Sequence, residues 1–317
     1  MARERKDNKQ TSWDLYEILG KEKSQGIQQY LSQAIKNCPF KRGQSNKCSK
    51  GKADKPLSIC SVIGRSFQNQ QAKEEKVVIC PYRFPEKQMI QDITSKYFPN
   101  LSANSVITLS EVKVLDPWNN TWRFDKVILC SKNKSCGANQ KPKVLALVEI
   151  QAVYISGNIT NLFFFLTNNP QKSTLLQLDA QITKEVDFRF RPDYLSSAKR
   201  LLFQMIFKFP IASALGAKLF GIVQKPLWET IERLIEGGVS ASNNNEGEGM
   251  PITWLVYDFD SKNQLHLIDT KETYMWQILN SLTYRDPNDP SLKEWKESIY
   301  RLLNKLIQQK TKKVSKT

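Results

Sequence analysis

Residues 144–153 read Val144-Leu145-Ala146-Leu147-Val148-Glu149-Ile150-Gln151-Ala152-Val153, an apolar run that only two polar side chains interrupt. Short runs rich in Val, Ile and Leu are typical of buried strands. Because side chains alternate across a strand, Glu149 and Gln151 are expected to share one face. A second strand-like run, Trp122-Arg123-Phe124-Asp125, is expected to direct the Asp125 carboxylate into the same cleft.

Asp125 and Glu149 are candidate ligands of a divalent metal beside a phosphodiester. Mg²⁺ prefers oxygen ligands and usually takes only one or two carboxylates, keeping its other positions for water and substrate phosphate oxygens. A bound metal polarises the phosphoryl group and lowers the pKa of an attacking water. Gln151 would orient that water or the phosphate by hydrogen bonding. The alternative is an exposed strand face, because this triplet of residue types is common in strands.

The charge balance indicates an anionic partner. Lys and Arg total 47 against 31 Asp and Glu, a net charge of +16, and the isoelectric point is near 9.5. Such a balance is typical of proteins that bind polyanions and release counterions on binding. No apolar stretch is long enough to span a bilayer, and residues 1–10 lack the apolar core of a signal peptide. We therefore expect a cytoplasmic protein that binds nucleic acid and no membrane.

Two absences narrow the chemistry. His266 is the single histidine, so a nuclease mechanism that needs paired histidines cannot be assembled within one subunit. The sequence also contains no Gly-rich loop ending in Gly-Lys-Ser or Gly-Lys-Thr, which excludes a P-loop ATPase. Carboxylate and metal chemistry remains.

Four of the six cysteines fall in a segment rich in Lys, Gly, Ser and Gln: Cys38, Cys48, Cys60 and Cys80. Disulfides are disfavoured in the cytoplasm, so a tetrahedral four-thiolate site for Zn²⁺ or a single iron is one interpretation. The spacing lacks paired Cys-x-x-Cys motifs, which leaves scattered free thiols as the alternative. A metal would have a structural role here, because the segment is expected to have too little apolar content to fold by itself.

Hydrophobic periodicity and turn residues predict alternating strands and helices. Strands at 105–115, 121–130 and 144–154 are expected to form a meander that brings their middles together, and further strands are expected at 218–224, 253–259 and 264–270. Helical patterns cover 13–35 with a break near 20–25, 85–97, 158–167, 193–209, 226–236, 273–282 and 290–309. The sequence thus predicts an α/β (α+β) fold with a mixed central β-sheet flanked by helices.

Together these pieces resemble the NotI family of type II restriction endonucleases, within the nuclease superfamily whose motif is Pro-Asp, then Asp or Glu, any residue, and Lys (PD-(D/E)xK). One match is Arg123-Phe124-Asp125 followed by Glu149-Ile150-Gln151, where glutamine stands in the lysine position. The segment Tyr194 to Leu202 is similar to the family's helix after the active-site strands. The four cysteine motifs resemble the family's iron site: Cys38-Pro39-Phe40, Cys48-Ser49-Lys50, Ile59-Cys60-Ser61 and Cys80-Pro81-Tyr82-Arg83-Phe84.

The resemblance implies a PD-(D/E)xK nuclease-like core and double-strand DNA cleavage by a homodimer at a palindromic site. It also implies that Asp125 and Glu149 bind Mg²⁺, that Gln151 positions the nucleophile, and that the four cysteines hold structural iron. Ligand chemistry alone leaves zinc open at that site. Neutral Gln151 can only donate and accept hydrogen bonds, so charge neutralisation is expected from the metal or from arginine. Two domains are expected: residues 1–84 with an N-terminal helix and the metal-binding segment, and residues 85–317 with the nuclease core and a helical C-terminal region.

Other assignments are less determined by the sequence. Glu111 is a candidate further acid for the cleft. A basic cluster of Arg189, Arg191, Lys199 and Arg200 is a candidate DNA contact, with a solvated basic face as the alternative. The two-fold symmetry of the duplex gives an independent reason to expect two copies of the chain.

Two other functions are compatible with the composition. The first is a non-catalytic, metal-stabilised DNA-binding protein or transcriptional regulator. The second is an iron-thiolate redox protein, against which the absence of a flavin motif counts. The pair of Asp125 and Glu149 favours a nuclease, because a protein that only binds DNA has no use for acids that repel the phosphate backbone.

Overall fold

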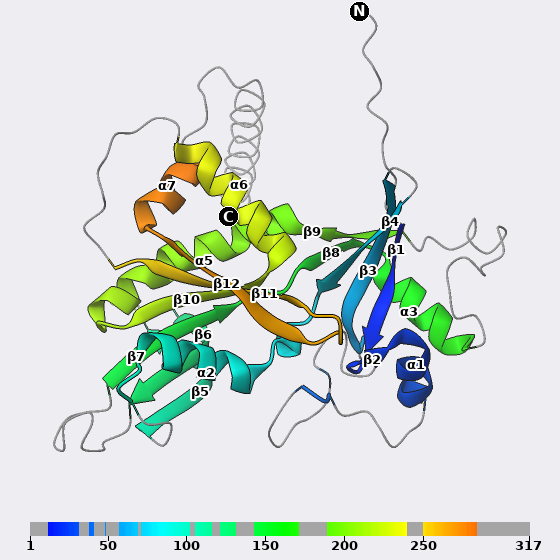
Figure 1. Ribbon diagram of the computed structural model, residues 1–317, viewed down its shortest axis with the longest axis horizontal. Coiled ribbons are helices and arrows are strands. Elements are labelled where there is room, and N and C mark those ends of the chain that lie inside the picture. Colours follow the sequence, from blue (N-terminus) through cyan, green and yellow to red (C-terminus); the bar gives the residue numbers. More distant parts are fainter. Residues whose placement is uncertain are drawn as a thin grey trace, which may run out of the picture.

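The computed structural model describes residues 12–31, 38–40, 48, 57–68, 71–101, 105–115, 121–130, 143–170, 189–239 and 250–283. Two β-sheets and a short two-stranded ribbon form its framework, with helices packed around them (Figure 1). No helix among these residues is long and apolar enough to cross a membrane.

A mixed six-stranded sheet forms the larger part of the molecule. Its strand order is β12-β11-β10-β7-β6-β5. The strands β5 (Val106–Leu115), β6 (Thr121–Cys130) and β7 (Lys143–Ile150) run antiparallel to one another, as the predicted meander requires. The strand β10 (Lys218–Gln224) is parallel to β7 and to β11 (Ile252–Phe259), while β12 (Leu265–Thr273) is antiparallel to β11.

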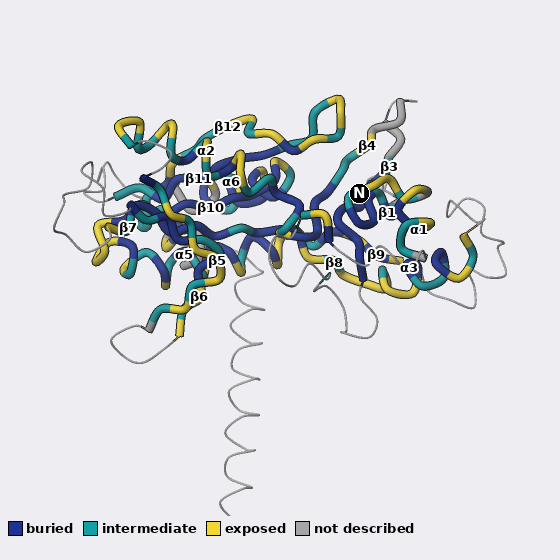
Figure 2. Tube along the Cα trace, turned by 90° about the horizontal axis from the view of Figure 1, so that it is seen from below, coloured by how far each residue is buried: buried dark blue, intermediate teal, exposed yellow. Residues whose placement is uncertain are grey.

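Helices cover both faces of this sheet, which confirms the expected mixed sheet flanked by helices. On one face, α2 (Glu86–Tyr97) buries Met89 and Ile93 in a core with Phe220 and Ile222 of β10. On the other face, α5 (Tyr194–Ala214) and α6 (Lys225–Val239) pack over Leu219 and other core residues, and α7 (Met275–Thr283) lies beside α6. The central strands are buried almost throughout, as the dark blue trace in Figure 2 shows.

A second, antiparallel sheet has the order β2-β1-β3-β4. It consists of β1 (Ser12–Ile18), β2 (Lys21–Glu22), β3 (Ile59–Gln68) and β4 (Gln71–Val78). Two helices lie beside it, α1 (Lys23–Leu31) and α3 (Ile159–Asn168), the latter as predicted. The apolar side chains of this sheet join the same hydrophobic cluster as α5 and α6.

The helix predicted from residue 13 is wrong for residues 13–18, which form β1. Pairing of β1 with β3 buries Leu15 and Ile18, and this tertiary contact outweighs the short helical pattern. Leu19 and Gly20 follow with φ values of 50° and 75°, and a right-handed helix cannot contain such residues. The helix therefore starts only after this turn.

The cysteine-rich segment contains more apolar structure than the sequence analysis expects. The hairpin of β3 and β4 buries Ile59, Val62, Val77 and Val78, so residues 59–68 and 71–78 have their own sheet contacts. The composition of the segment does not reveal this, because the burial depends on the pairing of β3 with β4 and β1.

The strand β7, which contains most of the apolar run 144–153, ends earlier than predicted. After Ile150 the chain leaves the ladder: the Gln151 amide donates to the carbonyl of Ile222, and the Val153 amide donates to the carbonyl of Val78. Residues 151–153 thus pass from the large sheet to the small one. The chain then enters β8 (Tyr154–Gly157), which pairs with β9 (Phe190–Asp193).

Other predicted elements lie close to their expected bounds, and those of β6 and β10 agree to the residue. The helix predicted at 290–309 lies outside the described residues. The division into domains at residue 84 stays a prediction.

Candidate active site

Asp125 and Glu149 lie where β6 and β7 separate. The two antiparallel strands pair as far as Lys126 opposite Val148; Asp125 directly precedes Lys126, and Glu149 directly follows Val148. The backbone amide of Ile150 then donates a hydrogen bond of 2.8 Å to Oδ2 of Asp125. This bond holds the Asp125 carboxylate at the point of separation, beside Glu149.

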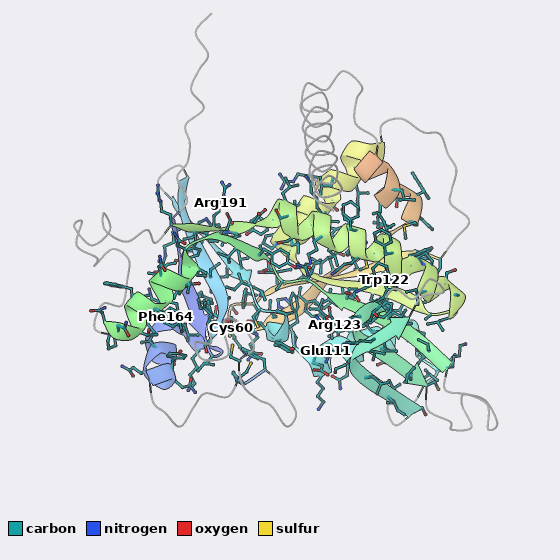
Figure 3. All side chains as sticks on the ribbon, turned by 180° about the vertical axis from the view of Figure 1, so that it is seen from behind. Cys60, Glu111, Trp122, Arg123, Phe164 and Arg191 are labelled. Atoms are coloured by element: carbon teal, nitrogen blue, oxygen red, sulfur yellow. The ribbon has the colours of Figure 1, made fainter. Side chains whose placement is uncertain are left out.

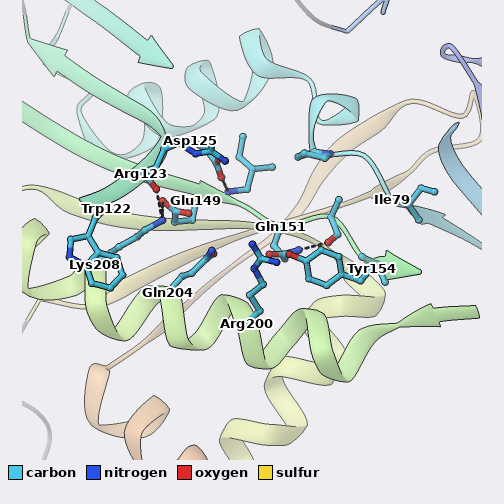
Figure 4. Close-up of a pocket in the computed structure, with 14 residues that line it drawn as sticks. Ile79, Trp122, Arg123, Asp125, Glu149, Gln151, Tyr154, Arg200, Gln204 and Lys208 are labelled. Carbon is cyan, nitrogen blue, oxygen red and sulfur yellow. Dashed lines mark hydrogen bonds and ion pairs between the residues drawn. The ribbon is translucent and has the colours of Figure 1, made fainter. Parts of the chain in front are cut away.

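The three candidate catalytic residues of the sequence analysis line one cavity. Its volume is about 330 Å³, and Asp125, Glu149 and Gln151 all contribute to its wall. The helix α5 closes the opposite side with Arg200, Gln204 and Lys208 (Figure 4). The geometric expectation of a shared cleft is therefore met, while the roles of these residues stay predictions.

Glu149 projects toward α5 because of the alternation along β7. Leu147 belongs to the core on the α5 side of the sheet, whereas Ala146 and Val148 belong to the core on the α2 side. Glu149 follows the phase of Leu147 and is only 3% exposed. Burial raises the pKa of Glu149 to about 7, with Lys208 opposing the shift and Asp125 adding to it.

Asp125 is less shielded than Glu149 but responds to the same surroundings. Burial raises the pKa of Asp125 above its usual value, against the hydrogen bond from the Ile150 amide and the charges of Lys208 and Arg123. The two carboxylates therefore sit in a shielded cavity where their ionised forms require a nearby cation.

That cation is Lys208, which the sequence analysis does not assign to the site. Its Nζ lies 2.6 Å from Oε1 of Glu149 and donates a hydrogen bond of 2.6 Å to the backbone carbonyl of Arg123. A signal was present in the sequence, because Lys208 falls in the apolar stripe of α5. Its neighbours in that stripe are all buried: Ala198, Leu201, Leu202, Met205 and Ala212.

Gln151 is 8% exposed and lies directly beyond the end of β7. Its side-chain amide donates to the backbone carbonyl of Ala152. Its backbone amide bonds to Ile222 of β10, so the residue is fixed at both ends. Gln151 thus presents a neutral amide at the cavity wall on the same side of the chain as Glu149.

Glu111 lies outside this cavity. It is exposed on β5 with a φ of 52°, and its Oε1 accepts a hydrogen bond of 3.0 Å from the hydroxyl of Tyr82. Glu111 and Asp125 instead both line a neighbouring cavity of about 400 Å³. Asp125 thus lines both cavities, as do Pro81, Arg123 and Ile150. The charge of Glu111 is one of the influences that raise the pKa of Asp125.

One of the four basic residues of the predicted DNA contact lies at the cavity, and the DNA contact as a whole stays a prediction. Arg200 lines the cavity and stacks over the ring of Tyr154, 5.2 Å from its centroid. Arg189, Arg191 and Lys199 are not among the residues that line it. Figure 3 shows Arg191 on β9, well away from Arg123 and Glu111.

None of the four cysteines of the predicted metal segment is in a disulfide; Cys38, Cys60 and Cys80 are buried and Cys48 is half-buried. Burial raises the pKa of the Cys60 thiol well above its usual value, and Cys80 and Cys38 raise it further, so these thiols are neighbours. Among the described residues, no group of three or more His, Cys, Asp or Glu has the arrangement of a metal site. The four-cysteine site therefore stays a prediction.

Comparison with known proteins identifies the family. The model of restriction endonuclease NotI matches residues 23–274, a region that contains both acids, Gln151, Lys208 and all four cysteines. No curated protein shows a significant match to this sequence. Because the matched region covers most of the 317 residues, the chain belongs to the NotI family of restriction endonucleases, which are nucleases that cleave DNA at specific sites.

Proposed function

We propose that this protein is a Mg²⁺-dependent type II restriction endonuclease that hydrolyses phosphodiester bonds in both strands of DNA at a palindromic site. The cavity between β6, β7 and α5 is its active site. One observation carries the proposal: two carboxylates on adjacent strands, and an amide directly beyond the end of one of them, line a single cavity of about 330 Å³ within the family-matched region.

The donor set of the cavity fits magnesium. Asp125 and Glu149 offer only oxygen atoms, and a pair of carboxylates is the usual protein contribution to a Mg²⁺ site. Asp125 and Glu149 would hold the ion, which would polarise the phosphoryl group and lower the pKa of a water molecule. Both acids are shielded and have raised pKa values, so their paired charges are best stabilised by a cation of this kind.

The chain's own groups divide the remaining work. Gln151, held at the end of β7, orients the attacking water through its amide. Arg200 projects from α5 at the cavity wall and is placed to hold a phosphate of the bound strand. Arg189, Arg191 and Lys199 contact DNA further from the cut, and Glu111 provides a further acid on the other side of Asp125.

Two copies of the chain act together. A single cavity accounts for hydrolysis of one strand, and a duplex read at a palindromic site presents two equivalent strands related by a two-fold axis. A homodimer places one cavity at each strand.

Digestion of DNA tests this proposal directly. Incubation of unmethylated plasmid and phage DNA with Mg²⁺ should give discrete fragments, and sequencing of their ends should reveal one common palindromic site. The same reaction with EDTA should leave the DNA intact, because the two acids then have no ion to hold. A random smear with Mg²⁺, or intact DNA at every metal concentration, would refute the assignment.

The four cysteines hold a structural iron or zinc ion in this proposal. Purified protein should contain about one such ion per chain, and Cys60→Ser should lose it and melt at a lower temperature. The matched control is Val62→Ala, equally buried in β3, which should lower stability but keep the metal. Elemental analysis beside a melting curve measures both effects. Metal-free protein with unchanged stability in Cys60→Ser would show that the thiols are only core residues.

A further inference from the structure

The cavity needs a positive charge that Gln151 does not provide. A phosphodiester under attack gathers negative charge on its non-bridging oxygens, and two carboxylates on the wall repel that charge. Gln151 is a neutral amide, and Arg123 and Arg200 are both exposed. The buried cation that lines the cavity is Lys208.

Burial of Lys208 is costly and therefore informative. The residue is 3% exposed, in the middle of the apolar stripe of α5. An ammonium removed from water requires strong compensation, and an apolar residue at this helix position would avoid that cost. Stability alone does not explain a lysine here.

The position of the ammonium is fixed from several sides. Nζ lies 2.6 Å from Oε1 of Glu149 and 2.6 Å from the carbonyl oxygen of Arg123, and it sits over the ring of Phe124, 5.2 Å from its centroid. An ammonium has three N–H donors. Among the described residues, one N–H is donated to the carbonyl of Arg123 and the ion pair with Glu149 engages at most one more, which leaves at least one for a group inside the cavity.

We propose that Lys208 is a catalytic residue whose ammonium, delivered from α5, hydrogen-bonds a non-bridging oxygen of the scissile phosphate in place of the charge that Gln151 lacks. The ammonium neither gains nor loses a proton in this role; it stabilises the charge that develops as water attacks phosphorus. This inference rests on the proposed function of the cavity. It also assigns to a helix lysine the neutralisation that the sequence analysis expects from a metal or an arginine.

Exchange of the two residues tests the inference. Lys208→Gln should lower the single-turnover cleavage rate about 100-fold or more at saturating protein. The double variant Lys208→Gln/Gln151→Lys has the composition and net charge of the parent but carries the ammonium on the other wall of the cavity. It should recover at least about tenfold of the lost rate, since the developing charge requires a cation and not a particular strand or helix.

Binding and stability measurements separate this role from a structural one. The affinity of Lys208→Gln for a DNA fragment containing the cut site, measured without divalent metal, should stay within roughly an order of magnitude of the parent. The matched control is Lys23→Gln, because Lys23 is also shielded and ion-paired, with Asp14 at 2.7 Å, but lies outside the cavity. It should keep the parent's cleavage rate per folded molecule.

Each outcome decides the question. Cleavage by Lys208→Gln at the parent's rate would overturn the inference, and so would a folded exchange variant as slow as Lys208→Gln. If Lys208→Gln does not fold, the single-turnover cleavage rate of the exchange variant, compared with that of the parent, decides whether the inference holds. The variant Asp125→Asn separates a failure of this inference from a failure of the proposed function. Normal cleavage by Asp125→Asn would refute the active-site assignment. If Asp125→Asn is inactive while Lys208→Gln is active, only the role of Lys208 is refuted.

Discussion

Glu149→Gln and Asp125→Asn should each slow DNA cleavage by about 1000-fold or more at saturating Mg²⁺. Each substitution keeps the shape of the side chain but removes one of the two carboxylate charges that line the cavity. A metal held by such a pair provides several kcal/mol of transition-state stabilisation, and each 1.36 kcal/mol corresponds to a tenfold change in rate. The measurement is the rate of linearisation of supercoiled plasmid per folded molecule.

The affinity of Glu149→Gln and Asp125→Asn for DNA should not fall together with their cleavage rate. Without divalent metal the two acids repel the phosphate backbone, so neutral amides at these positions should leave the affinity for DNA unchanged or higher. The matched control is Asp14→Asn, which also removes a buried carboxylate paired with a lysine, at 2.7 Å, but does so in the small sheet. A cleavage rate within about tenfold of the parent for either active-site variant would place the catalytic metal elsewhere.

The strands that position the acids could be predicted because their signal is local. Alternation along residues 144–151 puts Glu149 and Gln151 on one face, and turn residues at either side of residues 121–130 mark the next strand. The bounds of β6 and the antiparallel order of β5, β6 and β7 agree with this. Together with the cysteine motifs, the same residues carried the resemblance that the family match confirms.

The rest of the site depends on contacts between distant parts of the chain. Lys208 is 59 residues beyond Glu149. Neither the strand pattern around Glu149 nor the helix pattern around Lys208 predicts that α5 packs against this end of β7. The only sequence signal was a lysine in an apolar helix stripe, which indicates a buried charge but not its partner. Likewise the local pattern of residues 13–18 predicts a helix, because the strand that pairs with them, β3, lies far along the chain.

Arg83→Met should lower the free energy of unfolding by about 3–5 kcal/mol. The guanidinium is buried and donates from Nε and Nη2 to the carboxylate of Glu17, at 2.8 and 2.9 Å. Nη2 also donates to the backbone carbonyl of Asn263 at 2.9 Å. Removal of the guanidinium would leave the carboxylate of Glu17 buried without this cation, with the hydroxyl of Ser61 still donating to it.

The matched control is Arg65→Met. Arg65 also pairs with a glutamate, Glu74 at 3.0 Å, but their side chains are 42% and 49% exposed. Solvent screens such a pair, so its loss should change the free energy of unfolding by less than about 1 kcal/mol. Urea unfolding of both variants, with fluorescence and circular dichroism as probes, measures the difference.

Arg83→Met should lower the free energy of unfolding strongly because Arg83 lies between the two sheets. It lies in the turn η1 (Pro81–Arg83) after β4, and joins Glu17 on β1 of the small sheet to Asn263 between β11 and β12 of the large one. The double variant Glu17→Gln/Arg83→Met removes both charges, so it should lose less stability than Arg83→Met alone. If the double variant is instead less stable than Arg83→Met, the hydrogen bond that Glu17 accepts from Ser61 matters more at this point than charge compensation.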